Sequence, residues 1–416
     1  MTTPMTKAQL LELICNGENS AVEFRRDDLG PESLAKEIVA LANLQGGRIL
    51  LGVEDEGTIT GIQRHDLEHW VMDTVFGHIV HPMILPFYEE VQVDDRLRVA
   101  VVTVSQGVAK PYVVRRRGRE DVYVRVGSTS RLASREQLAR LFANGGLLRT
   151  ELLPVSGSSL RDFSLERLSH YLVRIVGEDV APVTEQSWEE RLCALGFMVD
   201  RPGGAPVCTI AGLVLFGRAQ RRLLPNAGVR WMSFRGRDKD YRAQDDRLVN
   251  GPLVALFGGL SSGVGMRLEN GLIENLVDAM RPFVSRDDID PDAGMRRRRV
   301  WEYPSDALRE GILNALAHRD WTRNEETEIV RYSDRLEISS PGALQNSMTV
   351  EKMLAGQRPA RNPLIVEVLR DYGYVDARGM GVRRKFVPLL QEQDGTTPEY
   401  TATEDYVKLV MYRAPR

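Results

Sequence analysis

The first residues of this sequence whose types and spacing could support chemistry are three acids near its start. Glu18 and Glu23 are five residues apart, and Asp55 follows a later apolar segment. Hard oxygen ligands from separate elements are what Mg²⁺ or Mn²⁺ requires when it activates water against a phosphodiester. Glu18 and Glu23 would point to opposite faces of one strand, so they converge only if Glu18 lies in the loop or helix end before that strand.

The same acids also have structural interpretations. Glu23 and Arg25 share a strand face and could form a surface ion pair. Asp55 lies in the turn at residues 54–57, where Asp is favoured for local hydrogen bonding, and Glu54 is the alternative third acid. Spacing alone leaves a metal site and a structural role both open.

A second group of residues suits phosphate contacts. Residues 110–140 contain nine Lys or Arg and three acids, which gives +6 in a chain whose net charge is −3. Guanidinium groups stay charged and donate in pairs to phosphate, and tyrosines among them can stack on bases. The residues predicted to contact nucleic acid are Arg25, Lys110, Arg115, Arg116, Arg117, Arg119, Tyr123 and Arg125. The alternative is a solvated hairpin tip around Gly118.

The periodicity of the first 147 residues predicts the α+β unit that positions these groups. Helices are expected at residues 7–15, from Pro31 to the glycine pair at 46–47, and at 135–142. Strands are expected at residues 21–25, 48–53, 58–60, 89–93, 98–104 and 122–126. Glycines at 145–146 and the polar segment 156–159 mark the end of the unit.

Residues 160–300 predict an α/β middle region. A helix is expected at 188–195, an apolar strand at 209–216 and helical structure at 250–283. The order also suits a small winged-helix module, but no basic recognition helix accompanies it, which favours a connector. The four arginines at 296–299 are flanked by acids at 287–292, so we expect a self-neutralising loop.

Residues 301–416 contain a possible nucleotide site. A helix at 306–317 places Glu310, Asn314 and, nearly, His318 on one face. An Asn oxygen can coordinate Mg²⁺ between phosphates while a Glu one turn earlier orients water, although a solvated polar face explains an isolated E-x-x-x-N equally well. Further strands are expected at 328–332, 335–339 and 406–412, and further helices at 350–355 and 364–372.

Composition limits the class of protein. The 416 residues suffice for two to four domains, and no apolar segment is long enough to cross a bilayer. Three cysteines without C-x-x-C spacing argue against a disulfide framework and a structural zinc site, and the N-terminus lacks an apolar signal-peptide core. We therefore expect a cytoplasmic protein without a membrane partner. The absence of G-x-x-x-x-G-K-[ST] argues against a translocating motor.

Three segments resemble a known family. Residues 17–25 (GENSAVEFR), 42–57 (ANLQGGRILLGVEDEG) and 123–128 (YVRVGS) are similar to the Schlafen-like, Alba-type nucleic-acid-binding domain. In Schlafen proteins that cleave transfer RNA, an E-x-x-x-x-E pair and a downstream acid form the catalytic metal site. The resemblance places catalysis and Mg²⁺ or Mn²⁺ on Glu18, Glu23 and Asp55. Paired glutamates also occur in members regarded only as DNA-binding.

The C-terminal part resembles a second family. Residues 209–217 (TIAGLVLFG), 334–342 (DRLEISSPG), 361–365 (RNPLI) and 379–383 (GMGVR) are similar to the RecG-like, divergent ATP-binding domain of the GHKL type. The resemblance implies a nucleotide site formed by Glu310, Asn314, Ser340, Gly342, Gly379 and Gly381. Ser340 stands where the family has Asp or Asn, and a hydroxyl cannot supply a carboxylate to the adenine amino group. This departure weakens the expectation of ATP binding.

These observations predict an α+β protein with an Alba/Schlafen-like domain at 1–147, an α/β region at 160–300 and a GHKL-like α/β sandwich at 301–416. The predicted function is a prokaryotic nucleic-acid-binding protein that cleaves structured, tRNA-like RNA with a divalent metal in stress or phage defence. The alternative is a non-catalytic DNA-binding regulator with a nucleotide-sensing C-terminal domain. We also expect a homo-oligomer, since several copies would extend a modest basic patch along RNA or DNA.

Overall fold

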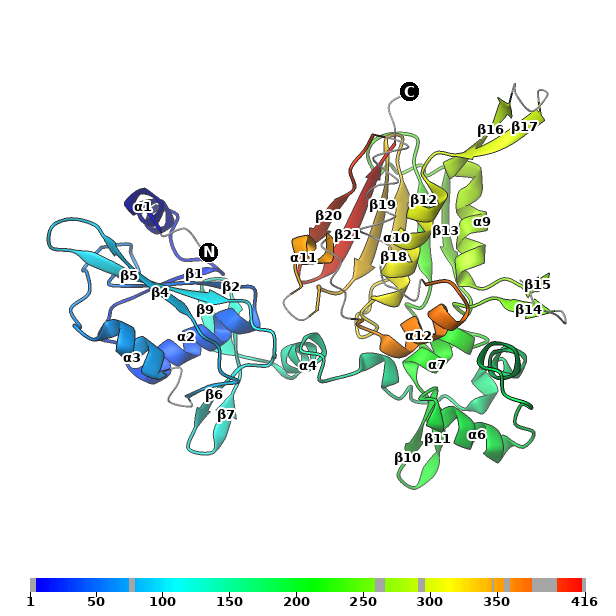
Figure 1. The fold of residues 1–416 in the computed structure, drawn as a ribbon, viewed down its shortest axis with the longest axis horizontal. Coiled ribbons are helices and arrows are strands. Elements are labelled where there is room, and N and C mark those ends of the chain that lie inside the picture. The colour runs from blue at the N-terminus through cyan, green and yellow to red at the C-terminus, as the bar shows by residue number, and fades with distance from the viewer. Residues whose placement is uncertain are drawn as a thin grey trace. The chain divides into compact units, whose positions relative to one another are not determined.

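The structure is a computed structural model that describes residues 5–74, 79–258, 266–290, 296–345, 348–354, 360–375 and 395–413 (Figure 1). It divides into two compact units, Met1–Leu148 with Gln345–Ser347, and Arg149–Leu344 with Met348–Arg416. Each unit contains both helices and strands in sheets that are largely antiparallel. The predicted α+β class is therefore confirmed.

The N-terminal unit is built on a four-stranded sheet in the order β1-β2-β5-β4. Its strands are β1 (Val22–Arg25), β2 (Gly46–Leu51), β4 (Phe87–Gln92) and β5 (Arg98–Ser105). Strand β1 is parallel to β2, and the other neighbours are antiparallel. Helices α2 (Pro31–Asn43) and α3 (Leu67–Thr74) pack on one face, and α1 (Lys7–Cys15) packs on the other.

Alternation along β1 decides which side chains meet the helices. Val22 and Phe24 join the core beneath α1, so Glu23 and Arg25 point to the α2 face. The glycine pair sets the close approach of β2, because a Cβ at Gly46 (φ +82) would lie 2.6 Å from the Val104 carbonyl oxygen. The position of Glu23 on the α2 face thus follows from the alternation along β1, while Gly46 allows β2 to approach β5.

Two hairpins complete the N-terminal unit. The first belongs to a sheet in the order β3-β6-β7, and the second pairs β8 with β9. Their bounds are β3 (Val80–His81), β6 (Val113–Arg116), β7 (Arg119–Asp121), β8 (Tyr123–Val126) and β9 (Thr129–Leu132), followed by α4 (Arg135–Asn144). Buried Asn43 at the end of α2 donates to the carbonyls of Tyr112 and Tyr123, both at 2.9 Å, and so fixes both hairpins to α2.

The second unit contains a six-stranded sheet in the order β13-β12-β18-β19-β21-β20. The bounds are β12 (Val229–Ser233), β13 (Asp245–Val249), β18 (Thr327–Arg331), β19 (Arg335–Pro341), β20 (Glu399–Ala402) and β21 (Tyr406–Tyr412). Helices α9 (Leu272–Val284) and α10 (Ser305–Ala317) cover one face, and α12 (Pro363–Asp371) packs beside α7 in the same hydrophobic core. The predicted helix at 306–317 and the strands at 328–332, 335–339 and 406–412 are confirmed.

The remaining elements of this unit lie mostly between residues 149 and 301. They are α5 (Leu165–His170), α6 (Glu185–Ala194), β10 (Met198–Arg201), β11 (Gly204–Cys208), α7 (Ile210–Phe216), α8 (Gln220–Leu223), β14 (Leu256–Gly258), β15 (Met266–Glu269), β16 (Ser285–Asp290), β17 (Arg296–Trp301) and α11 (Val350–Leu354). Phe163, Phe197 and Phe216 pack into the same hydrophobic core as Trp231 and Ile338. The middle region and the C-terminal third therefore share one core.

Four predicted elements differ in the structure. Residues 209–216 form helix α7 rather than a strand, because the Thr209 hydroxyl accepts the Gly212 N–H and caps a helix buried on all sides. A continuous apolar run does not distinguish a buried helix from a buried strand. Within residues 250–283, the β14–β15 hairpin precedes the only described helix, α9. Residues 58–60 form only an isolated bridge, Val53 to Ile59.

The fourth difference concerns the arginine run at 296–299. It is strand β17, antiparallel to the acidic strand β16, and not a loop. Asp287 lies opposite Arg299, and Asp288 lies opposite Arg298. The expected loop is thus replaced by a pair of antiparallel strands that place an acidic segment opposite a basic one.

Candidate functional site

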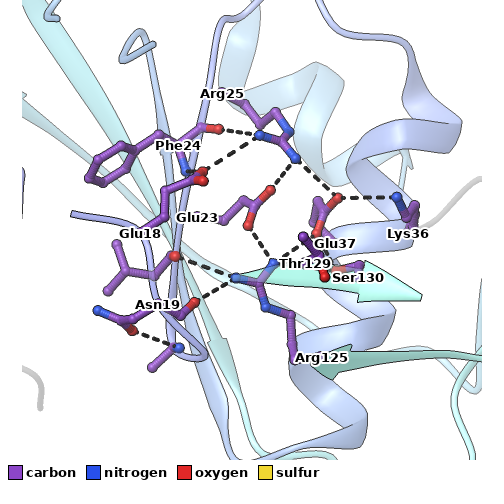
Figure 2. Close-up of polar contacts among 12 residues, drawn as sticks. Glu18, Asn19, Glu23, Phe24, Arg25, Lys36, Glu37, Arg125, Thr129 and Ser130 are labelled. Carbon is purple, nitrogen blue, oxygen red and sulfur yellow. Dashed lines mark hydrogen bonds and ion pairs between the residues drawn. The ribbon is translucent and has the colours of Figure 1, made fainter. Parts of the chain in front are cut away.

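The three predicted catalytic acids meet at Arg25 in the N-terminal unit. Figure 2 shows Glu18 and Glu23 beside Arg25. Glu18 lies in the loop before β1, which is the position that allows it to converge with Glu23. Arg25 Nη1 lies 3.6 Å from Glu18 Oε1 and 3.4 Å from Asp55 Oδ1. Arg25 Nη2 forms an ion pair with Glu23 Oε1. The structure therefore brings the predicted acids together, but around a guanidinium group.

A fourth acid, Glu37 on α2, belongs to this cluster and was missed by sequence reasoning. Its Oε1 lies 3.5 Å from Arg25 Nη2 and 3.8 Å from Lys36 Nζ. The signal was available, because Glu37 is three residues after Leu34 and four before Leu41 on the apolar face of the predicted helix. A charged residue on a buried helix face needs a partner of opposite charge.

That partner is Arg125 of β8, whose side chain is fully buried. Its Nη1 donates to Glu23 Oε2 and, at 3.3 Å, to Glu37 Oε2, while Nη2 donates to the Asn19 carbonyl oxygen at 2.6 Å. Ser130 of β9 also donates to Glu37. The prediction that Arg125 contacts nucleic acid is therefore wrong, because its guanidinium is enclosed by the protein (Figure 2).

Burial changes the acidity of Glu23. Its side chain is 1% exposed, and burial together with the charge of Glu37 raises its pKa to about 7. The guanidinium groups of Arg125 and Arg25 act in the opposite direction. Two buried carboxylates thus face two arginines, so the charges of the inner cluster balance when all four groups are ionised.

The outer acids of the cluster, Glu18 and Asp55, differ from the buried inner acids, Glu23 and Glu37. Glu18 Oε1 accepts the Phe24 N–H at 2.8 Å, so Glu18 also supports the start of β1. The Asp55 side chain is 78% exposed. Glu54, the alternative third acid, pairs instead with Arg26 at 3.4 Å.

This arrangement does not fit Mg²⁺ or Mn²⁺. Within the described ranges, no group of three or more Asp, Glu, His or Cys is placed so that it could hold a metal ion. Arg25 and Arg125 engage the two oxygens of Glu23, and a divalent ion beside Arg25 would be repelled by its charge.

The predicted basic surface separates into internal and external residues. Lys110 is buried and its Nζ donates to the Leu44 carbonyl oxygen at 2.6 Å, so the prediction that it contacts nucleic acid is wrong. Tyr123 is half-buried, and its ring lies 5.9 Å from Lys36 Nζ. Arg25 is 31% exposed and serves the acid cluster.

The external arginines lie on the β6–β7 hairpin. Arg115 pairs with Glu120 at 2.7 Å, Arg116 with Glu32 at 2.7 Å and Arg119 with Asp121 at 3.0 Å. These pairs are on the surface, where both partners are hydrated.

Arg117 and Gly118 form the tip of this hairpin. Both have positive φ, 47° and 78°, as a two-residue type I′ turn requires. Arg116 and Arg119 lie directly opposite each other across the turn. Among the described residues, Arg117 takes part in no ion pair that would neutralise it.

In the second unit, α10 places Glu310 and Asn314 on one half-buried face, where Asn314 Nδ2 lies 3.1 Å from Glu310 Oε1. Ser340 is buried and donates its hydroxyl to the Ala315 carbonyl oxygen at 2.7 Å. That hydroxyl joins β19 to α10, so Ser340 does not fit the adenine-contacting role implied by the resemblance.

The position beside Gly342 is also filled. Gly342 has φ +109, and a Cβ there would lie 2.5 Å from the Asp320 Cβ. Buried Asp320 forms an ion pair with Arg361 at 3.1 Å. Gly379 and Gly381 lie outside the described residues.

The segment Arg361-Asn362-Pro363 has a structural role that sequence reasoning missed. Buried Asn362 donates to the carbonyl oxygens of Ala317 and Arg319, both at 2.9 Å. Ala317 is the last residue of α10 and Arg319 lies just beyond it, where carbonyl oxygens without helical partners need donors. The motif therefore closes the end of the helix that carries Asn314.

No helix among the residues shown is long and apolar enough to span a membrane.

Comparisons with known proteins bear on both units. Residues 18–134 match the family model described as "Schlafen, AlbA_2", and residues 324–411 match the one described as "Putative ATP-dependent DNA helicase recG C-terminal". A search of curated proteins gives no significant match.

Two solved structures are similar at low identity. The DIP2311 protein from Corynebacterium diphtheriae is 21% identical with a TM-score of 0.44, and the match covers 98% of this chain and 80% of that chain. The structure described as the "N-terminal Domain of Putative ATP-dependent DNA Helicase RecG-related Protein" from Nitrosomonas europaea is 24% identical with a TM-score of 0.24, covering 32% of this chain and 94% of that chain.

The two family models cover most of the segments on which the sequence resemblance rests, although residues 209–217 lie outside both matches. Together they support nucleic-acid binding as the class of function. The chain thus contains a Schlafen/AlbA_2 domain at residues 18–134 and a RecG-like C-terminal domain at residues 324–411.

Proposed function

We propose that this protein binds nucleic acid and that the arginine tip of the β6–β7 hairpin contacts the phosphates. The observation that supports this is the juxtaposition of Arg116 and Arg119 across a turn whose first residue is Arg117. Three guanidinium groups are thus concentrated at one exposed hairpin end.

This arrangement opposes the stability of the hairpin. Like charges directly opposite on neighbouring strands repel each other. A type I′ turn favours Asn or Gly at the position that Arg117 occupies, since most side chains are strained at positive φ. A polyanion between the arginines removes the repulsion, and guanidinium groups match phosphate oxygens in pairs.

The acidic partners of the hairpin can be displaced. Glu32, Glu120 and Asp121 are 48%, 49% and 28% exposed, so their ion pairs lie in a high-dielectric environment. Exposed pairs of this kind contribute only about 0–1 kcal/mol. A phosphate backbone releases counterions when arginines bind it, which supplies the larger free energy at low salt.

The test is a salt titration of the full chain with labelled duplex DNA and with a labelled structured RNA. In the variant Arg116→Gln/Arg117→Gln/Arg119→Gln, the slope of log K against log salt falls by about 2–3. The matched control is Arg26→Gln/Arg96→Gln/Arg98→Gln, which changes the charge of exposed residues of the same unit by the same amount. Equal slopes for wild type and hairpin variant contradict the proposal.

Metal-dependent cleavage of tRNA-like RNA is the second candidate function, and it requires that Arg25 leave the acids so that a divalent ion can take its place. The convergence of Glu18, Glu23 and Asp55 supports it, and their pairing with Arg25 opposes it. Total RNA is incubated with the protein and Mn²⁺, beside Asp55→Asn, whose exposed side chain can be changed without disturbing the core. Cleavage that is lost in this variant establishes the nuclease, whereas equal cleavage or none rejects it.

The same titrations address the partner. Tighter binding of the RNA or of the duplex at equal salt decides between an RNA-directed protein and a DNA-binding regulator. Self-association, which would join several hairpins along one strand, is measured by light scattering of the free chain and of its complex. A monomer in both contradicts it.

A further inference from the structure

The geometry points to Arg25 as a built-in cation that takes the place of a divalent metal among Glu18, Glu23, Glu37 and Asp55. One terminal nitrogen faces Glu18 at 3.6 Å and Asp55 at 3.4 Å. The other faces Glu37 at 3.5 Å and pairs with Glu23. Carboxylates from four separate segments therefore converge on one positive group.

The inner carboxylates have no oxygen left for a metal. Glu23 uses one oxygen for Arg25 and the other for Arg125. Glu37 uses Oε1 for Arg25 and Lys36, and Oε2 for Arg125 and Ser130 (Figure 2). A divalent ion can bind here only if an arginine leaves.

Arg25 is the arginine that can be removed. Arg125 is fully buried and also holds the backbone carbonyl oxygen of Asn19, whereas Arg25 is 31% exposed at the outer side of the cluster. Without Arg25, four carboxylates remain beside one enclosed guanidinium and the Lys36 ammonium group, still an excess of negative charge that a divalent cation neutralises.

A guanidinium and a metal ion differ in what they can do. Both neutralise carboxylates, but guanidinium has no open coordination position, so it cannot bind and acidify a water molecule. In this chain the cluster therefore stabilises β1 against α2 and β8. The inference does not depend on the hairpin, so weak nucleic-acid binding would leave it intact.

The test measures Mn²⁺ binding to the full chain by electron paramagnetic resonance, which reports the free ion. Wild type leaves the Mn²⁺ signal unchanged, and Arg25→Met gains affinity by at least about tenfold. Arg25→Lys keeps a positive charge and behaves as wild type. Arg26→Met is the matched control, because Arg26 is 60% exposed and pairs with Asp28 and Glu54 instead.

A second variant assigns the gained ion to the cluster. Glu23→Gln added to Arg25→Met removes one of the converging carboxylates and lowers the gained affinity again. If Arg25→Met alone does not fold, Mn²⁺ added during refolding restores its far-ultraviolet circular dichroism. Wild type that binds Mn²⁺ as tightly as Arg25→Met overturns the inference, and so does a variant that neither binds the ion nor is rescued by it.

Discussion

Arg125 and Arg117 belong to the same basic segment, yet the structure gives them opposite roles. Arg125 is fully buried and bound by Glu23, Glu37 and backbone oxygens. Arg117 stands at an exposed hairpin tip in a left-handed conformation. A local charge of +6 in the sequence therefore describes two different structures, an internal ion-pair network and an external cationic tip.

The difference shows that the cost of desolvation assigns the role of a charged residue. A buried guanidinium must be matched by carboxylates and hydrogen bonds, so it fixes neighbouring elements. An exposed one keeps its hydration and remains available to a ligand. The following predictions test this contrast in order of expected size.

The largest effect is expected for Arg125→Met. The substitution leaves Glu23 and Glu37 without their inner partner and should lower the free energy of unfolding of the N-terminal unit by about 3–5 kcal/mol. Urea unfolding, with hydrogen exchange of residues 18–25 as the local readout, measures it. Arg131→Met, on the exposed surface of the adjacent strand, should change stability by less than about 0.5 kcal/mol. Similar losses in both variants would break the contrast.

A second prediction concerns pH. The pKa of Glu23 is raised from 4.5, its ordinary value in an unfolded chain, to about 7 in the folded unit. Between pH 4.5 and pH 7 the folded state therefore binds more protons than the unfolded state. The free energy of unfolding should therefore fall as pH rises from 4.5 to 7 and level off above, by on the order of 3 kcal/mol in total. In Glu23→Gln this contribution disappears. If the free energy of unfolding depended on pH in Glu23→Gln as it does in wild type, the pH dependence would belong to other groups.

The contrast can be extended to neighbouring serines in the second unit. Ser340 is buried and donates to the Ala315 carbonyl, whereas Ser339 is half-buried on the opposite face of β19. Ser340→Ala should cost about 1 kcal/mol of stability, because a buried hydrogen bond is lost. Ser339→Ala should cost clearly less in the same thermal unfolding experiment. Equal costs would show that burial does not decide the role of the hydroxyl.

A smaller effect distinguishes the contribution of the hairpin tip to stability from its contribution to nucleic-acid binding. Arg117→Asn puts a favoured residue in the type I′ turn and relieves charge repulsion, so stability should rise by about 0.5 kcal/mol. The salt slope for nucleic-acid binding should fall by about 1 at the same time. A variant that is more stable and binds as before would limit the tip to a structural role.

The smallest effect is expected for ATP. Because Ser340 and the Asp320–Arg361 pair fill the positions beside Gly342, ATP at about 1 mM should raise the melting temperature by less than about 1 °C. A rise of several degrees would show that the Glu310–Asn314 face takes part in a nucleotide site.

The sequence was sufficient for much of the fold. Periodicity and the glycine pair predicted α2, β2 and the strands of the first sheet, and the motifs identified both domains. It failed where a pattern has two physical solutions. The apolar run at 209–216 is a helix because Thr209 caps it and the core surrounds it. The arginines at 296–299 form a strand rather than a loop, because their backbone pairs in antiparallel register with the acidic strand β16.

For the candidate site, the sequence by itself determined that acids and arginines occur together and that Glu23 and Arg25 share a strand face. Only the tertiary structure decided which of them meet. It brought Glu37 from α2 and Arg125 from β8 to Glu23, across contacts that no local spacing encodes. The physical reason is that burial requires every charge to find a partner, and partners distant in sequence become neighbours only when the sheet, α2 and the β8–β9 hairpin pack together.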